Sequence, residues 1–253
     1  MINLSVAIIT YNEEKNIERC LLSVKDIADE IIVVDSLSDD NTVAICNKYN
    51  ATVISQKFLG HIEQKNLALS KTTYPYVLSL DADEALSEEL KDSINKVKRN
   101  WEYDSYFFNR RTNYCGKWIS HSGWYPDAKI RLWKKDTGMW GGVNPHDTVV
   151  MEKNASKKHL NGDLLHYSFY TIEEHIEQIN KFSSIKAREM FKKGKHFSFF
   201  KMFSSTVAKF FKHYIIKLGF LDGVDGFIIS VNSAHSTFLS HVKLRQLIRD
   251  ARK

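Results

Sequence analysis

The stretch of residues 76–83, Tyr-Val-Leu-Ser-Leu-Asp-Ala-Asp, decides the fold because a short apolar run leads directly into a pair of aspartates. Another apolar run, residues 4–9, opens the chain and ends at Thr10, and two more lie at residues 31–34 and 51–55. Apolar runs of this length are typical of strands that are buried on both faces of a parallel sheet. We therefore predict that each of these runs is a strand of one sheet.

Helical patterns separate the predicted strands. Apolar residues between 17 and 24 recur at the spacing of one helix face, with Asn12 as the expected N-cap. Further helices are predicted over residues 40–50, over residues 62–70 and directly after Ser87. Strands that alternate with helices of this length predict an α/β fold with a mostly parallel sheet, flanking helices and right-handed crossovers.

Polar side chains follow three of the predicted strands: Thr10 and its neighbours, Asp35, and Asp81 with Asp83. Ligands of open parallel sheets bind outside the carboxyl ends of the strands, so we expect these side chains to line one crevice. Neither the glycine fingerprint of dinucleotide-binding folds nor a P-loop follows the first strand. Any nucleotide must therefore be held by side chains.

Asp81 and Asp83 form a D-x-D triplet directly after an apolar strand. Two carboxylates in this place can hold Mg²⁺ or Mn²⁺, which keeps further coordination positions for substrate phosphate oxygens. Such a metal would bridge a diphosphate and stabilise the charge that builds on it as a bond breaks. The alternative interpretation is an aspartate that caps the following turn.

The segments that carry this chemistry resemble those of family 2 glycosyltransferases. They are residues 5–13, residues 32–36 with Asp39 and Thr42, residues 64–69 and residues 80–84. Within that family, later segments resemble the branch of bacterial lipopolysaccharide core glucosyltransferases. Those later segments are residues 125–127, 130–133, 144–147, 219–223 and 226–227. The resemblance implies a GT-A fold and transfer of a hexose from UDP, with inversion of the anomeric centre.

The resemblance also implies a nucleotide site. Thr10, Tyr11 and Asp35 would line the base and ribose of a UDP-sugar, with Glu13 beside them and Asp81 near the ribose. A carboxylate such as Asp35 suits this role because it can accept hydrogen bonds from a uracil N–H or a ribose hydroxyl. For Asp35 a turn cap is again the alternative.

A metal site is implied in the same way. Asp83 would be the principal ligand of Mg²⁺ or Mn²⁺, and either His146 or His166 would add a further ligand. His166 follows an apolar pair at a predicted strand end. Further contacts to the donor are implied for Gln64, Lys65 and Asn66. For the lysine, a solvated helix face is the alternative.

An inverting displacement requires a carboxylate that takes the proton from the acceptor hydroxyl. We assign this role to Asp147, which follows a segment rich in turn formers, residues 141–145. Asp127 is the rival, but its neighbours Lys129 and Arg131 offer it an ion pair. Arg131 would otherwise steady the leaving diphosphate.

The C-terminal region is strongly basic. Residues 192–253 contain twelve Lys or Arg against three Asp, a net charge of +9, whereas the whole chain carries +6. A capping box at residues 171–174 predicts a long helix, and apolar residues between 200 and 218 share a helical face. Lysines interrupt this second pattern, so no transmembrane span is predicted. Its apolar face is expected either to pack on the catalytic domain or to lie on an anionic membrane surface.

We expect a catalytic domain over residues 1–168 and a helical, basic region over residues 169–253. Three scattered cysteines indicate free thiols in a reducing compartment. The first residues lack the basic segment of a signal peptide. The expected location is the cytoplasm, in peripheral contact with the inner face of the plasma membrane.

The sequence therefore predicts an inverting transferase that moves a hexose, with glucose the expected sugar, from UDP to a lipopolysaccharide core or a related surface glycan. Its expected partners are a UDP-sugar, a glycolipid or oligosaccharide acceptor and an anionic membrane, and not nucleic acid, since no nucleic-acid-binding motif is present. A nucleotidyltransferase is one rival, although its usual glycine-rich loop with a basic residue is missing after the first strand. A non-catalytic membrane-binding protein that retains the fold is the other.

Overall fold

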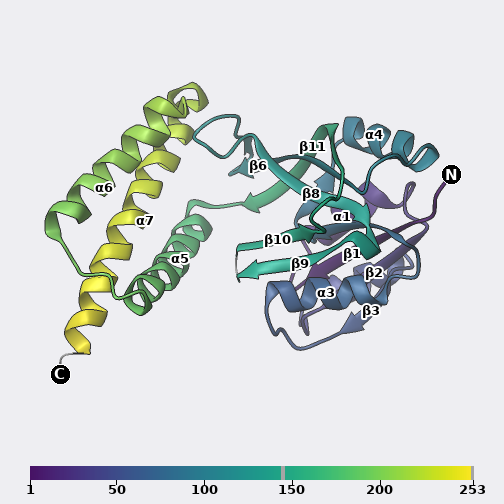
Figure 1. Ribbon diagram of the computed structural model, residues 1–253, viewed down its shortest axis with the longest axis horizontal. Helices are drawn as coiled ribbons and strands as arrows, with labels where there is room; N and C mark the ends of the chain where they lie inside the picture. Colours follow the sequence, from purple (N-terminus) through teal and green to yellow (C-terminus); the bar gives the residue numbers. More distant parts are fainter. Residues whose placement is uncertain (144–145, 252–253) are drawn as a thin grey trace. The chain divides into compact units, whose positions relative to one another are not determined.

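The computed structural model describes residues 1–143 and 146–251. The chain divides into two compact units, and each is described by itself (Figure 1). Unit 1 comprises Met1–Arg111 and Asp127–Tyr167, and unit 2 comprises Thr112–Pro126 and Ser168–Lys253. The segment Thr112–Pro126, which the sequence placed in the catalytic domain, thus groups with the C-terminal helices.

Unit 1 is built on parallel strands in the order β3-β2-β1-β4. These strands are β1 (Leu4–Thr10), β2 (Glu30–Asp35), β3 (Thr52–Ser55) and β4 (Tyr76–Asp81). The helices between them are α1 (Ile17–Val24), α2 (Thr42–Lys48) and α3 (His61–Lys71). The predicted alternation of strands and helices is therefore confirmed.

Beyond β4 the sheet continues with antiparallel strands. β8 (Asp127–Lys134) pairs with β4 and with β6 (Ser105–Tyr114), β7 (Lys117–Trp118) pairs with β6, and β5 (Glu84–Leu86) pairs with β11 (Lys157–Phe169). A short turn, η1 (Lys135–Thr137), leads into a separate hairpin of β9 (Gly138–Val143) and β10 (His146–Met151). The sheet is therefore mixed, and only its N-terminal half is parallel. After α4 (Glu88–Arg99), the described residues of unit 1 contain no helix longer than the short η1, and antiparallel neighbours need no crossover helix.

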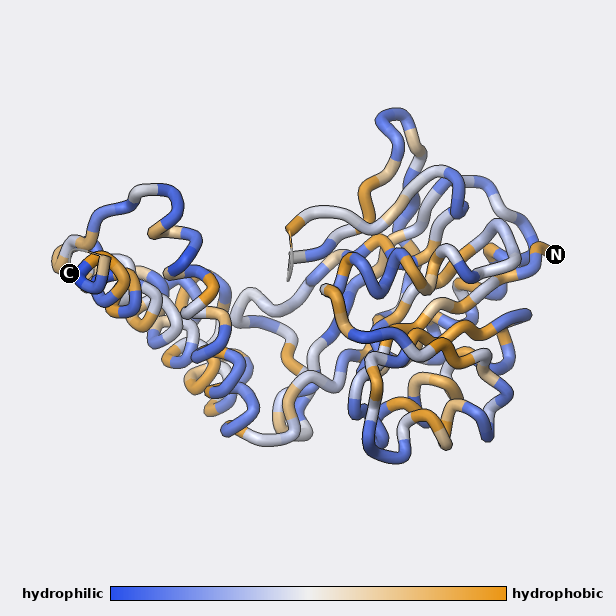
Figure 2. Tube along the Cα trace, turned by 90° about the horizontal axis from the view of Figure 1, so that it is seen from below, coloured by the Kyte–Doolittle hydropathy of each residue, from blue (hydrophilic) through white to orange (hydrophobic). Residues whose placement is uncertain are grey.

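Strands β1, β2 and β4 are largely buried, as predicted, whereas the prediction was wrong for β3, which lies at the edge of the sheet and has no buried residue. Leu4, Val6 and Ile8 of β1 belong to one apolar core, whereas Ala7 belongs to a second core together with Trp133. Figure 2 shows runs of hydrophobic residues along the chain of this unit. Truncating a leucine in such a core to alanine typically costs about 2–5 kcal/mol. This packing on both faces fixes the strand ends that carry the polar residues.

Local signals set the ends of the helices in unit 1. Ser87 caps α4 as predicted, and its hydroxyl accepts a hydrogen bond from the Leu90 N–H at 3.2 Å. The prediction for Asn12 was wrong, because α1 begins at Ile17 and Asn12 has a left-handed φ of 52°. Asparagine tolerates this conformation. Its N–H and side chain instead contact Ser38 and Asp39, which joins the loop after β1 to the loop after β2.

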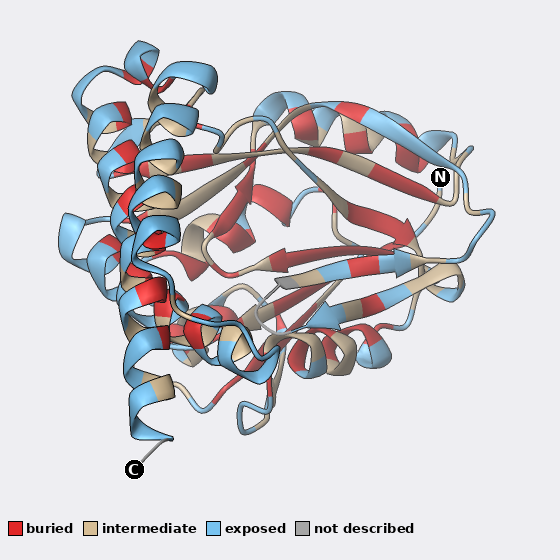
Figure 3. Ribbon diagram, turned by 60° about the vertical axis from the view of Figure 1, so that its left-hand side comes forward, coloured by how far each residue is buried: buried red, intermediate tan, exposed pale blue. Residues whose placement is uncertain are grey.

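Unit 2 is mainly helical. Its helices are α5 (Ile172–Lys192), α6 (Phe199–Phe211), the π-helical turn η2 (Lys212–Ile216), the short helix η3 (Gly219–Asp222) and α7 (Gly223–Asp250). The predicted capping box is present, since Thr171 and Glu174 exchange side-chain to backbone hydrogen bonds. Figure 3 shows that these helices carry both buried and exposed residues along their length. Among the described residues, no helix has the length and apolar character that a membrane crossing requires.

Asp222 connects the helices of unit 2 to the loop at residues 119–122. Its buried carboxylate accepts hydrogen bonds from the backbone N–H groups of Ser120 at 3.2 Å and His121 at 2.9 Å. Gly226 is required nearby, because a Cβ atom there would collide with the carbonyl oxygen of Gly219. Residues 219–227, which carried part of the family resemblance, thus have a structural role.

Candidate functional site

The carboxyl ends of the parallel strands bring the predicted polar residues to one edge of the sheet. Thr10 at the end of β1 pairs with Asp35 at the end of β2, and Ile9 pairs with Asp81 at the end of β4. The three polar clusters recognised in the sequence therefore lie side by side. This is the edge at which parallel sheets bind ligands.

Asp35 and Thr10 form the first part of this edge. The buried carboxylate of Asp35 accepts hydrogen bonds from the N–H of Ser38 at 3.0 Å and from its hydroxyl at 2.5 Å. Asp35 therefore caps the turn, as the alternative interpretation proposed. The hydroxyl of Thr10 is buried and has no hydrogen-bond partner among the described residues, whereas the side chain of Tyr11 is exposed. A buried hydroxyl of this kind is available to a ligand.

Asp81 is held between two cationic side chains. The Nζ atom of Lys65 lies 2.9 Å from Asp81 Oδ1, and Nη2 of Arg131 lies 3.1 Å from Oδ2. Burial alone would raise the pKa of Asp81, but the charges of Lys65 and Arg131 outweigh it and hold that pKa well below its usual range. The carboxylate is therefore ionised, and its charge is already compensated within the protein.

Glu84 extends this charged cluster into the core. Its carboxylate is fully buried, lies 2.7 Å from Nη2 of Arg131 and accepts a hydrogen bond from the N–H of Asp81 at 2.9 Å. Burial would lower the pKa of Arg131, but Glu84, Asp81 and Asp147 together raise it, so the guanidinium stays charged. The ring of Trp140 lies 4.3 Å from Lys65 Nζ and 5.1 Å from the Arg131 guanidinium carbon. The sequence alone assigned no role to Glu84. The one feature that could have indicated a role is its position directly after the D-x-D triplet.

The three residues predicted on α3 make contacts within the protein. Gln64 donates a hydrogen bond to the hydroxyl of Ser36 at 2.9 Å, and Asn66 exchanges two hydrogen bonds with the backbone of Trp140, at 2.9 and 3.0 Å. Lys65 is only 3% exposed, so the alternative of a solvated helix face was wrong. These side chains fix the edge of the sheet and the β9–β10 hairpin relative to α3.

Asp83 and His166 form the part of the site that suits a metal ion. Strand β5 pairs with β11 so that His166 lies opposite Glu84, and the Tyr167 N–H donates to the Asp83 carbonyl oxygen at 2.9 Å. Nε2 of His166 therefore lies 3.1 Å from Oδ2 of Asp83. Among the described residues, no group of three or more His, Cys, Asp or Glu is arranged to hold a metal. A carboxylate and an imidazole nonetheless suit Mn²⁺, and Mg²⁺ and Mn²⁺ commonly take other ligands from substrate phosphates and water. The side chain of His146 lies outside the described residues.

Glu13 is a titratable group at the same edge. Burial raises its pKa to about 7 from the usual 4.5, the hydrogen bond from Asn16 opposes this, and the charges of Asp83, Asp40 and Asp81 add to it. Its N–H donates to the hydroxyl of Thr42 at 2.8 Å. Near neutral pH the Glu13 side chain therefore changes its charge.

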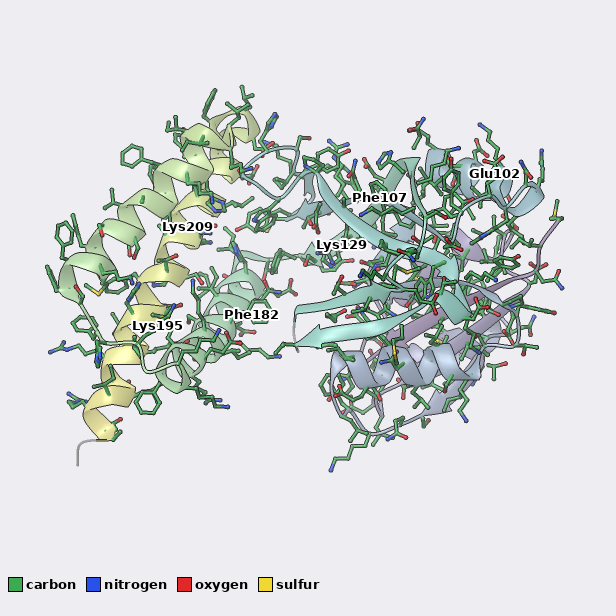
Figure 4. The ribbon with its side chains drawn as sticks, viewed as in Figure 1. Glu102, Phe107, Lys129, Phe182, Lys195 and Lys209 are labelled. Carbon is green, nitrogen blue, oxygen red and sulfur yellow. The ribbon has the colours of Figure 1, made fainter. Side chains whose placement is uncertain are left out.

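Asp147, the predicted base, lies on β10 and contacts Lys65, with 2.7 Å between Oδ2 and Nζ. Lys65 thus connects Asp147 with Asp81, and the structure brings the predicted base to the D-x-D edge. The rival Asp127 is paired with Arg110 and with Lys129, which is labelled in Figure 4, at 2.9 Å each. The expected pair of Asp127 with Arg131 is not formed, because Arg131 is buried with Asp81 and Glu84.

Comparison with known proteins identifies the class to which this fold and site belong. Residues 5–159 match the family described as Glycosyl transferase family 2. The chain is 37% identical to an uncharacterized glycosyltransferase of Rickettsia typhi, over 98% of this chain and 88% of that protein. The chain therefore belongs to glycosyltransferase family 2 and is a glycosyltransferase, and the predicted GT-A class is confirmed.

Two further likenesses are more distant. The lipopolysaccharide core biosynthesis glycosyltransferase LpsC of Rhizobium meliloti is 28% identical over 96% of this chain and 92% of that protein. The crystal structure of residues 1–349 of S. aureus TarS in complex with UDP covers 99% of this chain and 92% of its own, with a TM-score of 0.48 and 15% identity.

Proposed function

We propose that this glycosyltransferase transfers a hexose, with glucose the proposed sugar, from UDP to a lipopolysaccharide core or a related surface glycan, with inversion. The observation that carries this proposal is the Asp83–His166 pair, which lies at the strand ends beside the compensated carboxylate of Asp81. The likeness to a relative named for lipopolysaccharide core biosynthesis supports the acceptor class.

In this proposal Asp83 and His166 hold a divalent cation, Mg²⁺ or Mn²⁺. The bound metal would neutralise negative charge on the departing UDP. Asp81 is not a metal ligand in this arrangement, because Lys65 and Arg131 already compensate its charge. The same two cations reduce the repulsion between the acidic edge and an anionic nucleotide.

The donor nucleotide is proposed to bind along the ends of β1 and β2. The free hydroxyl of Thr10 and the carboxylate of Asp35 would bond the uracil or ribose, and the exposed ring of Tyr11 would cover the base. Glu13 would lie beside the diphosphate side of the site, and Asp81 near the ribose. Gln64, Lys65 and Asn66 would act indirectly, by holding the groups that bind the donor.

Asp147 is proposed to take the proton from the acceptor hydroxyl as that oxygen attacks the sugar. The ammonium group of Lys65 lies 2.7 Å from Oδ2 of this carboxylate. Lys65 also fixes the carboxylate beside Asp81, since one ammonium group binds both. The carboxylate of Asp147 is therefore already held in position before an acceptor binds.

Calorimetric titration with UDP, first with Mn²⁺ and then with EDTA, tests the metal and donor site. We expect binding that requires the metal, and Asp83→Ala should weaken it roughly 100-fold or more because a ligand is lost. Asp136→Ala is the matched control, since that aspartate is 68% exposed and lies in a surface turn. Metal-independent UDP binding, or unchanged binding by Asp83→Ala, would refute the site. No UDP binding at all would favour the non-catalytic or nucleotidyltransferase alternatives.

A further inference from the structure

Helix α6 of unit 2 buries Met202 and turns Ser205 toward α7, whereas most of its phenylalanines are exposed. Met202 is buried, and the Ser205 hydroxyl lies 3.3 Å from Nε2 of His241 on α7. In contrast, Phe199, Phe200 and Phe203 are 70%, 79% and 61% exposed. A helix that packs on a protein normally does the reverse and buries its apolar stripe.

The apolar residues that the sequence placed on a single helical face are divided between two sides. The rings of Phe210 and Tyr214 turn toward Phe227 of α7, with centroids 5.9 and 5.7 Å away. The remaining residues form an exposed surface that we call the aromatic face. It comprises Phe199, Phe200, Phe203, Val207 and Phe211 of α6, and continues with Ile215, Ile216, Leu218, Phe220, Leu221 and Val224. A large number of exposed apolar side chains on neighbouring elements marks an interaction site.

The charge around most of the aromatic face has a single sign, and Asp225 beside Val224 is paired with Lys117 at 3.3 Å. Between Glu189 and Asp222 the chain contains seven lysines and neither aspartate nor glutamate. Lys201, Lys212 and Lys217 are exposed on the same elements, and Lys195 and Lys209 are labelled in Figure 4. Exposed aromatic and aliphatic side chains bordered by lysines match the interface of an anionic bilayer, where the rings enter the headgroup layer and the lysines contact phosphates.

A second copy of the chain fits this surface poorly. A two-fold symmetric interface brings identical patches together, so lysines would face lysines. Because the segment contains no acidic residue, no ion pair could relieve that repulsion across the interface.

We propose that the aromatic face docks the protein on an anionic membrane surface. Phe199, Phe200, Phe203 and Phe211 enter the interfacial layer, and Lys201, Lys212 and Lys217 bind lipid phosphates. The sequence predicts that the apolar face of this helix either packs on the catalytic domain or lies on an anionic membrane, and this proposal selects the membrane. The docking itself does not depend on the transferase reaction. If the proposed function also holds, docking places the enzyme at the surface that carries a lipid-linked acceptor.

Co-flotation of the full chain with vesicles tests the proposal. We expect partitioning into vesicles of phosphatidylglycerol and phosphatidylethanolamine, and little into neutral phosphatidylcholine. Phe200→Ser/Phe203→Ser should lower the partition coefficient at least about tenfold, since two large apolar groups no longer leave water. Lys201→Gln/Lys212→Gln/Lys217→Gln should lower it roughly 100-fold at low salt and remove most of its salt dependence.

Matched controls separate docking from folding and from catalysis. Ile176→Ser/Phe182→Ser alters two exposed apolar residues of α5 and should partition as the unaltered protein does. All variants should keep the circular dichroism spectrum and melting temperature of the unaltered protein, because the substituted side chains point to solvent. Asp83→Ala should lose metal-dependent UDP binding and still partition normally, so a failure of the proposed function is recognised separately.

Three results would overturn the proposal. They are an absence of binding to anionic vesicles, equal binding to neutral ones, and unchanged binding by the phenylalanine variant. Sedimentation velocity without lipid provides a further test. A dimer that dissociates in Phe200→Ser/Phe203→Ser would identify a second copy as the occupant of the face and would also overturn the proposal.

Discussion

In most proteins charged side chains are exposed and apolar side chains are buried, and the two units depart from this distribution in opposite ways. Unit 1 buries charge, since Lys65, Arg131 and Glu84 are almost inaccessible to solvent. Unit 2 exposes apolar surface, since Phe200 and its neighbours on α6 project into solvent. Buried charges are tolerated only when they are paired, and exposed apolar surface is usually covered in function. The comparison teaches that each departure motivates one of the two proposals: a site for an anionic nucleotide in unit 1 and a membrane-docking surface in unit 2.

Among the variants of unit 1, replacing Asp147 by asparagine is expected to have the largest effect, which is a loss of turnover. The amide keeps the shape of the side chain and can still accept a hydrogen bond from Lys65, but it cannot take a proton. We expect turnover to fall 10²–10⁴-fold, the range for loss of a general base, while UDP and Mn²⁺ binding is retained. The measurement is UDP release from UDP-glucose in the presence of membranes that carry a truncated lipopolysaccharide core.

Asp127→Asn is the control for this prediction, because Asp127 is paired with Arg110 and Lys129 and not with the D-x-D edge. Its turnover should stay within a fewfold of that of the unaltered enzyme. The opposite ranking, with Asp127→Asn inactive and Asp147→Asn active, would transfer the role of base to Asp127.

Replacing Arg131 by methionine breaks the buried charge cluster directly. Asp81 would keep Lys65, but among the described residues Glu84 would keep only Arg110, 3.6 Å away, as a cationic partner. Removing one member of a buried ion pair costs about 3–5 kcal/mol, so we expect the free energy of unfolding in urea to fall by that amount. Lys129→Met, which removes a partly exposed pair with Asp127, should cost about 0–1 kcal/mol. Equal losses in the two variants would show that the cluster adds no more stability than a surface pair does.

The features that the sequence predicted correctly are those set by local pattern. Apolar runs identified the strands β1 to β4, and Ser87 and the capping box at Thr171 located two helix starts. The arrangement of strand ends followed from one general rule about parallel sheets. Each of these depends on residues close together in the chain.

The features that local pattern could not predict depend on residues far apart in the chain. The family resemblance suggested His166 as a ligand beside Asp83, but the two residues meet only because β11 returns antiparallel to β5. Lys65 is 82 residues from Asp147, and the pattern on α3 alone does not indicate that the lysine is buried. The aromatic stripe of α6 was visible in the sequence, but which residues turn toward α7 is decided by tertiary contacts such as that of Phe210 with Phe227.

The pH dependence of stability gives the smallest effect, and it has opposite signs in the two units. In unit 1, burial raises the pKa of Glu13 to about 7, so the folded protein keeps a proton that the unfolded chain loses near pH 4.5. Its contribution is therefore fully present below pH 4.5 and is lost as the pH rises to 7. We expect Glu13→Gln to remove this loss, on the order of 2–3 kcal/mol across the window, in urea unfolding series measured in EDTA.

His175 in unit 2 should show the reverse dependence. Burial lowers its pKa to about 4 from the usual 6.5, and the ring contacts the hydroxyl of Tyr114 at 3.0 Å. Because the unfolded chain binds the proton first, the contribution of His175 is fully present above pH 6.5 and is lost as the pH falls toward 4. His175→Gln should therefore remove a loss of unfolding free energy at acidic pH in the same series. Glu13→Gln instead removes a loss of unfolding free energy near neutral pH. If both variants changed the slope in the same direction, the two groups could not both be buried in their neutral forms, Glu13 protonated and His175 deprotonated, and the contrast between the units would not extend to their titratable groups.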